Sequence, residues 1–372
     1  MDWEILEVEI ETKKHALLGT GNCVLKDQKL ERMSRVRVVI NGRLGISFSP
    51  WGAMSLDQQL DQAMEKAVRG PKIAWVLSQK EDNNSKEPFP NNESAFDKLN
   101  FCPTGVVVIE SRKIKSKLLY HSGYSLQQDN FQSLATISLG NMRHIIPIAR
   151  VDIGSRPDSS HFTNSIELVK DYNETRLLDV PWLFSPIALS KIALRTWHEF
   201  LIADDKYGMA FPTGLWLQDK GYMFRTDFEG TTCRPVTFVF NGELITKAHD
   251  RISADLANAK PTGHGGLCGR FVWDMCVGPS SFDLYNLFPT SPSHVVISDA
   301  YPFNCQQEED FLLSISIVFD NKRCPDNVLV KLKSISDLFE ASLWCGPTQF
   351  GIKQWSSPWL ELMEPKKIFC LL

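Results

Sequence analysis

Apolar and polar residues alternate in an informative way over residues 35–49, RVRVVINGRLGISFS. Val36, Val38 and Ile40 alternate with their neighbours, and the alternation resumes after Asn41-Gly42. A period of two is typical of a β-strand with one buried face, and Asn-Gly is a strong signal for a two-residue hairpin turn. We therefore predict a β-hairpin over these residues.

The next segment, SLDQQLDQAMEKAVRG, changes to a helical period. Its apolar residues recur at spacings that place them on one helix face. Ser55 is suited to cap the first turn. Gly70-Pro71 would end the helix, because glycine suits the position after the last turn and proline lacks an N–H donor. We predict a helix between Ser55 and Gly70.

Strand patterns dominate most of the remaining chain. We predict strands over residues 106–110, 133–140, 144–154, 311–320 and 358–363, and a second hairpin over 234–245 that turns at Asn241-Gly242. The residues after Pro186 have helical spacing, which predicts a helix near residues 186–203.

Three segments are less regular. Residues 1–20 mix charged and apolar positions and leave a short helix or strand open. The polar run 80–94 contains two prolines and predicts an exposed loop. The pattern over 328–344 alternates at first and then loses its period.

These elements lack the β–α–β rhythm of a parallel sheet, which indicates the α+β class. A chain of 372 residues is long enough for two or three domains.

Composition and charge narrow the function classes. The net charge is −4 and no long basic run occurs, so nothing indicates nucleic-acid or anionic-membrane binding. Nine cysteines are an odd number without a CxxC pair, which is typical of reduced thiols in a cytoplasmic protein. The N-terminus lacks the apolar region of a signal peptide, and no apolar stretch is long enough to span a membrane.

His198-Glu199 is the first segment with residue types that can do chemistry. The common phosphate-loop, dinucleotide, serine-hydrolase, HExxH and CxxC motifs are absent. In zinc peptidases, two histidines one helical turn apart bind the metal and the neighbouring glutamate acts as base. The position one turn after His198 is Ile202, which cannot bind zinc. The simplest interpretation is a polar corner of an amphipathic helix.

A glycine-rich loop and a cysteine are the other candidates. The glycine loop, as we call residues 262–266, consists of Thr262, Gly263, His264, Gly265 and Gly266. Its three glycines would let the backbone approach a ligand closely, although a tight loop explains them as well. Cys345 precedes Gly346-Pro347 and is most simply a small buried residue, but its thiolate could bind a metal.

In their order, several segments resemble one known family. They are the hairpin and first helix, the DFEGT block at 227–231 with NGEL at 241–244, the glycine loop and the closing SSPWLELM. Together they resemble the TldD/PmbA family, also called TldD/TldE, and most closely its TldE (PmbA) branch, over roughly residues 35–363. The glycine loop departs from the family's TGxAGG pattern at Gly265, where alanine is usual, and at Leu267, where glycine would fall.

The resemblance implies an N-terminal α/β domain with the hairpin and packed helices over residues 1–175. It implies a C-terminal, mostly antiparallel β domain over residues 176–372, with the helix near 186–203 at the junction.

The resemblance also implies a heterodimer that acts on unfolded or short peptides, including those of natural-product pathways. A TldD-type subunit holds catalytic zinc with HExxxH and a distant cysteine, and a TldE-type subunit lacks the complete set. His198 and Glu199 are similar to the first metal ligand and the base, and Cys345 to the cysteine ligand. The second histidine of the motif falls on Ala203.

Three hypotheses follow. The first is a TldE-like, non-catalytic subunit without a cofactor of its own, with zinc in the TldD-type partner and the glycine loop facing the peptide. The second is a self-sufficient metallopeptidase with His198, His264 and Cys345 as zinc ligands and Glu199 as base. The third is a peptide-binding module unrelated to proteolysis, which the sequence does not separate from the first.

Overall fold

The computed structural model of the chain describes most of its length. The described residues are 2–18, 24–50, 52–73, 106–123, 125–139, 142–147, 167–168, 174–203, 211–221, 226–272, 274–279, 293–303, 311–319, 322–323, 328–332, 334–352 and 355–371. The loop predicted over 80–94 and residues 148–154 of a predicted strand lie outside them.

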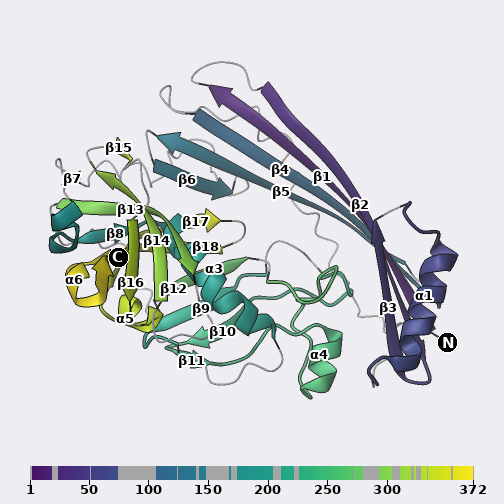
Figure 1. Cartoon of the computed structure of the whole chain (residues 1–372). Coiled ribbons are helices and arrows are strands. Elements are labelled where there is room, and N and C mark those ends of the chain that lie inside the picture. Colours follow the sequence, from purple (N-terminus) through teal and green to yellow (C-terminus); the bar gives the residue numbers. More distant parts are fainter. Residues whose placement is uncertain are drawn as a thin grey trace.

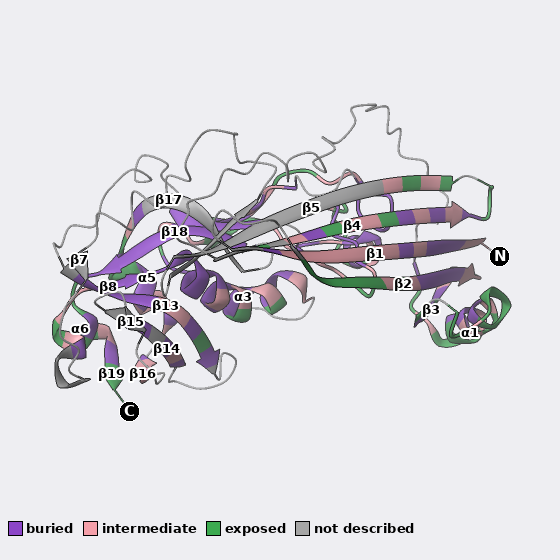
Figure 2. Ribbon diagram, turned by 90° about the horizontal axis from the view of Figure 1, so that it is seen from above, coloured by how far each residue is buried: buried purple, intermediate pink, exposed green. Residues whose placement is uncertain are grey.

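An antiparallel sheet of long strands forms the N-terminal part (Figures 1 and 2). Its strands, in spatial order, are β3 (Arg43–Pro50), β2 (Val24–Ile40), β1 (Asp2–Leu18), β4 (Val106–Tyr120), β5 (Ser125–Leu139) and β6 (Met142–Pro147). The predicted hairpin is confirmed, and Asn41 and Gly42 turn it with φ values of 52° and 71°. The segment that the pattern left open is the central 17-residue strand β1.

Helix α1 (Leu56–Arg69) covers one face of this sheet near β3 and confirms the predicted helix. The Ser55 side chain accepts a hydrogen bond from the Gln58 N–H, and the Gln58 side chain accepts one from the Ser55 N–H. Gly70 ends the helix with a φ of −71°, so a left-handed conformation is not its role. Glycine is required there because a Cβ would overlap the Leu44 carbonyl.

The sheet continues into the C-terminal part through a pairing between β6 and β17 (Leu343–Ile352). From β17 it passes to β18 (Trp355–Leu362), β8 (Trp182–Phe184), β13 (Ser293–Phe303), β14 (Phe311–Phe319), β16 (Val328–Leu332) and β19 (Phe369–Leu371). A branch from β18 contains β12 (Met275–Pro279), β9 (Leu215–Asp219), β10 (Val236–Phe240) and β11 (Glu243–Leu244). The shorter elements are β7 (Glu167–Leu168), η3 (Glu174–Asp179), α4 (Arg251–Leu256), β15 (Lys322–Arg323), α5 (Ile335–Glu340) and α6 (Pro365–Ile368).

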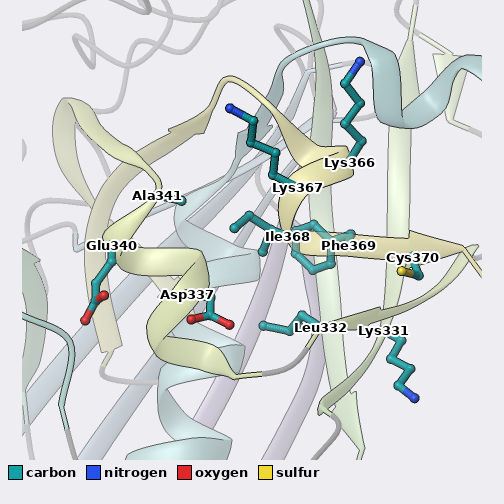
Figure 3. A pocket seen from close by; sticks show the side chains of 10 residues that line it. All are labelled: Lys331, Leu332, Asp337, Glu340, Ala341, Lys366, Lys367, Ile368, Phe369 and Cys370. Carbon is teal, nitrogen blue, oxygen red and sulfur yellow. The ribbon is translucent and has the colours of Figure 1, made fainter.

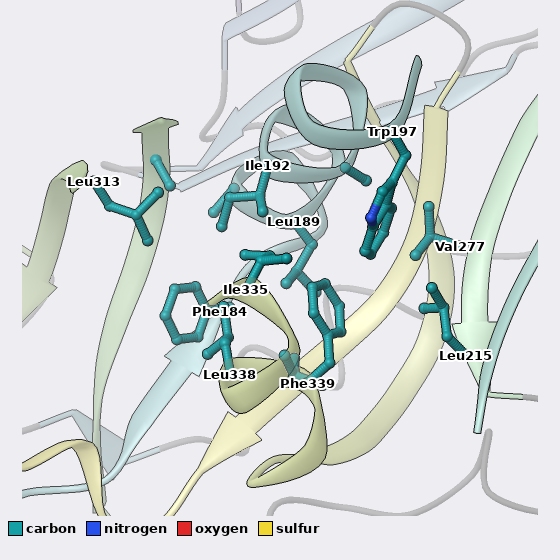
Figure 4. Close-up of a cluster of buried hydrophobic side chains, with 14 of the residues drawn as sticks. Phe184, Leu189, Ile192, Trp197, Leu215, Val277, Leu313, Ile335, Leu338 and Phe339 are labelled. Atoms are coloured by element: carbon teal, nitrogen blue, oxygen red, sulfur yellow. The ribbon is translucent and has the colours of Figure 1, made fainter. Parts of the chain in front are cut away.

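Helix α3 (Pro186–Ile202) organises the main hydrophobic core of this part. It packs against β13, β17 and β18, and α5 closes the same core (Figure 4). Trp197 is fully buried, with its ring 5.2 Å from that of Phe339 and 6.1 Å from that of Phe211. The core also includes Phe184, Leu189, Ile192, Leu215, Val277, Leu313, Ile335 and Leu338.

The predicted α+β class is confirmed, and most predicted elements are present. The hairpin over 234–245 is β10 and β11, and residues 328–344 lose their period because the short helix α5 separates β16 from β17. Within the described part of residues 2–147 the helix is α1. The predicted boundary at 175 and 176 falls within η3 and stays a prediction. No helix in the described parts has the length and apolarity needed to cross a membrane.

Candidate functional site

The structure places His198 and Glu199 near the end of α3, on its less buried side. The centroid of the His198 ring lies 6.1 Å from that of the Phe271 ring and 6.5 Å from that of the Trp355 ring. Glu199 is exposed, and its backbone carbonyl accepts the N–H of the C-cap Ala203. The predicted base therefore lies on the helix surface.

Cys345 lies on β17, away from this end of the helix. It pairs with Trp359 on β18. Trp355, which lies beside His198, is four residues earlier on β18 and therefore about 13 Å from Trp359 along the strand. Burial, with a smaller contribution from the Glu361 carboxylate, raises the pKa of the Cys345 thiol to about 12.

No group of three or more His, Cys, Asp and Glu side chains is placed to hold a metal ion in the described ranges, which include the four residues of the self-sufficient metallopeptidase hypothesis. His198 and Cys345 lie beside different residues of β18, Trp355 and Trp359. The His264 ring bonds to Thr262 and Asp219. The structure thus does not bring together the ligand set of the self-sufficient metallopeptidase hypothesis.

The glycine loop is buried between the N-terminal sheet and the C-terminal strands, apart from the half-buried Thr262. The Gly265 N–H donates to Asp227 Oδ2 at 2.7 Å, and the Gly265 carbonyl accepts the Phe228 N–H at 3.0 Å. The Gly266 carbonyl accepts from Arg35 Nη1 at 2.7 Å.

Hydrogen bonds to backbone carbonyls also hold the beginning of the glycine loop. The His264 carbonyl accepts the Phe271 N–H at 2.9 Å, and the Cys233 thiol donates to the Gly263 carbonyl at 3.2 Å. Burial and the charges of Asp227 and Asp219 raise the pKa of this thiol, which keeps its proton for that bond. A peptide would have to contact the loop through groups other than these, and the predicted peptide contact stays a prediction.

His264 is fully buried and bonded at both ring nitrogens. Its Nε2 lies 3.2 Å from Asp219 Oδ2, and its Nδ1 lies 2.8 Å from Thr262 Oγ1. Because a carboxylate only accepts hydrogen bonds, Nε2 carries a hydrogen and Nδ1 can accept from the hydroxyl. The order hydroxyl, imidazole, carboxylate is that of a nucleophile with its base. Here, however, Thr262 Oγ1 also accepts the His249 N–H at 2.7 Å, and this bond joins the glycine loop to the residue that precedes the N-cap of α4.

A buried ion network lies directly beneath the loop and consists of Glu4, Arg35, Arg37, Asp227 and Glu229. Arg37 on β2 forms ion pairs with Glu4 on β1 and with Glu229. Arg35 Nη2 lies 3.3 Å from Glu4 Oε1 and donates to the Phe228 carbonyl at 2.8 Å. These contacts fasten the N-terminal sheet to residues 226–271.

Protonation within the network depends on burial and on neighbouring charges. Burial and the adjacent Glu229 carboxylate raise the pKa of Asp227 to about 7, against the effect of three backbone N–H donors. Burial alone would raise the pKa of Glu229, but the charges of Arg37 and Arg35 outweigh it and lower the pKa. Glu229 therefore remains ionised while Asp227 titrates near neutral pH.

Sequence reasoning did not identify this network. Arg35 and Arg37 have the spacing of the polar side of a hairpin strand, and Glu4 lies in the irregular N-terminal segment. The available signal was the DFEGT block, whose Asp227 and Glu229 contribute two of the five side chains. Only the tertiary pairing shows that these charges lie together.

A separate open cavity of about 780 Å³ lies near α5 and α6 (Figure 3). Leu332 and Phe369 contribute apolar surface, and Lys331, Lys366 and Asp337 contribute charge. None of the predicted site residues lines it.

Comparison with solved structures shows what the fold is similar to. TldE from Thermococcus kodakarensis superimposes with a TM-score of 0.62 and 12% sequence identity, covering 97% of this chain and 95% of that one. The chain has the fold of TldE. This confirms the fold implied by the resemblance to the TldD/PmbA family.

Two further structures with the TldE fold are described as candidate modulators of DNA gyrase. The Thermotoga maritima protein has a TM-score of 0.58 and 13% identity, covering 97% of this chain and 95% of its own. The Bacteroides thetaiotaomicron protein has a TM-score of 0.56 and 11% identity, covering 100% and 95%. No protein-family model and no curated protein matches the sequence. At such low identity, the similarity establishes the fold alone.

Proposed function

We propose that this chain is a TldE-like, non-catalytic subunit of a heterodimeric zinc metallopeptidase that processes unfolded or short peptides in the cytoplasm. Zinc would belong to a TldD-type partner, and this chain would complete the chamber around the peptide. The observation that carries the proposal is the TldE fold over 97% of the chain, combined with Ala203 at the position of a metal-binding histidine.

The end of α3 supports this assignment. Ala203 is the C-cap of the helix, and its methyl group cannot coordinate a metal. The Lys247 ammonium donates to the Ala203 carbonyl at 3.1 Å and lies 4.5 Å from the Phe200 ring centroid. A cation at a helix C-terminus is favourable, and it would oppose a divalent metal at the same place.

The glycine loop and the ion network fit a subunit whose role is structural. Their polar groups bond to one another and join two parts of the chain. In the proposed complex they would form part of the chamber wall and would not supply reacting atoms. In the proposed complex, the base and the metal would come from the partner.

The test is co-expression with a TldD-type subunit encoded nearby, with zinc measured per chain and cleavage of an unstructured peptide as the assay. We expect no zinc in this chain alone, and one zinc with peptidase activity in the complex. His198→Ala and Cys345→Ala should leave the complex's zinc content unchanged, with His249→Ala as a control for histidine removal. One zinc per isolated chain, lost in either variant, would make this protein the enzyme and refute the proposal.

A further inference from the structure

We draw no further inference here: the strongest candidate, the open cavity near α5 and α6, carries nothing because both lysines of α6 that line it already form ion pairs and nothing in the described part of the chain shows which ligand would fill it.

Discussion

Replacing Arg37 with methionine removes the positive charge at the centre of the buried ion network while keeping a long side chain. Arg37 is 1% exposed and pairs with both Glu4 and Glu229. Arg35 remains 3.3 Å from Glu4, so that carboxylate keeps one cation nearby. Glu229 would lose its ion-pair partner Arg37 and keep the Arg251 N–H, which donates to its Oε2 at 2.7 Å.

Breaking a buried ion pair by removing one member typically costs about 3–5 kcal/mol, because the remaining charge stays desolvated. We expect the Arg37→Met substitution to lower the free energy of unfolding by that amount. Arg32→Met is the matched control, since Arg32 lies on the same β2 strand and pairs with Glu9 on β1 at 2.8 Å. This pair is solvent-exposed, and its loss should cost no more than about 1 kcal/mol.

Urea unfolding followed by tryptophan fluorescence measures both variants. With a slope of about 3 kcal/mol per molar urea, the Arg37→Met midpoint should fall by about 1 M or more. If Arg37→Met shifts the midpoint no further than Arg32→Met, the network does not hold the N-terminal sheet to residues 226–271 as we reason.

Three further predictions concern the same region and the hairpin. Gly265→Ala should lower the thermal midpoint, with a cost of about 1–3 kcal/mol, because a Cβ there would overlap the Glu229 side chain; an unchanged midpoint would show that Glu229 moves freely. Between about pH 4 and pH 7 folded Asp227 keeps a proton that the unfolded chain releases, so wild-type stability should fall as the pH rises through this range. Urea midpoints at several pH values should vary less in Asp227→Asn, and equal slopes would contradict the assigned pKa. Asn41→Val should destabilise the hairpin by about 1–2 kcal/mol in thermal unfolding, because Asn41 has a φ of 52° that a β-branched residue adopts poorly; a matching Asn41→Gly variant should be close to wild type.

Local chemistry made several elements predictable from the sequence. Both hairpins turn at Asn-Gly, whose left-handed backbone fits the twist of the strands, and Ser55 begins α1 with reciprocal side-chain bonds. The order of these short motifs was enough to indicate the TldE fold. The pattern leaves open the segment that forms the central strand β1, although Leu6, Val8 and Ile10 alternate with glutamates there, because apolar Ile5 beside Leu6 and the polar residues after Glu11 limit the alternation to six residues.

The candidate site depended more on tertiary structure. The sequence by itself determined that position 203 is alanine, so the HExxxH ligand set is incomplete whatever the fold. It also singled out the glycine loop, but presented it as a surface for a ligand. Only the folded chain decided that this loop is buried on Arg35 and Asp227, which lie far from each other along the chain. Burial and ion pairing between distant segments depend on which surfaces meet, and no local period or spacing encodes that meeting.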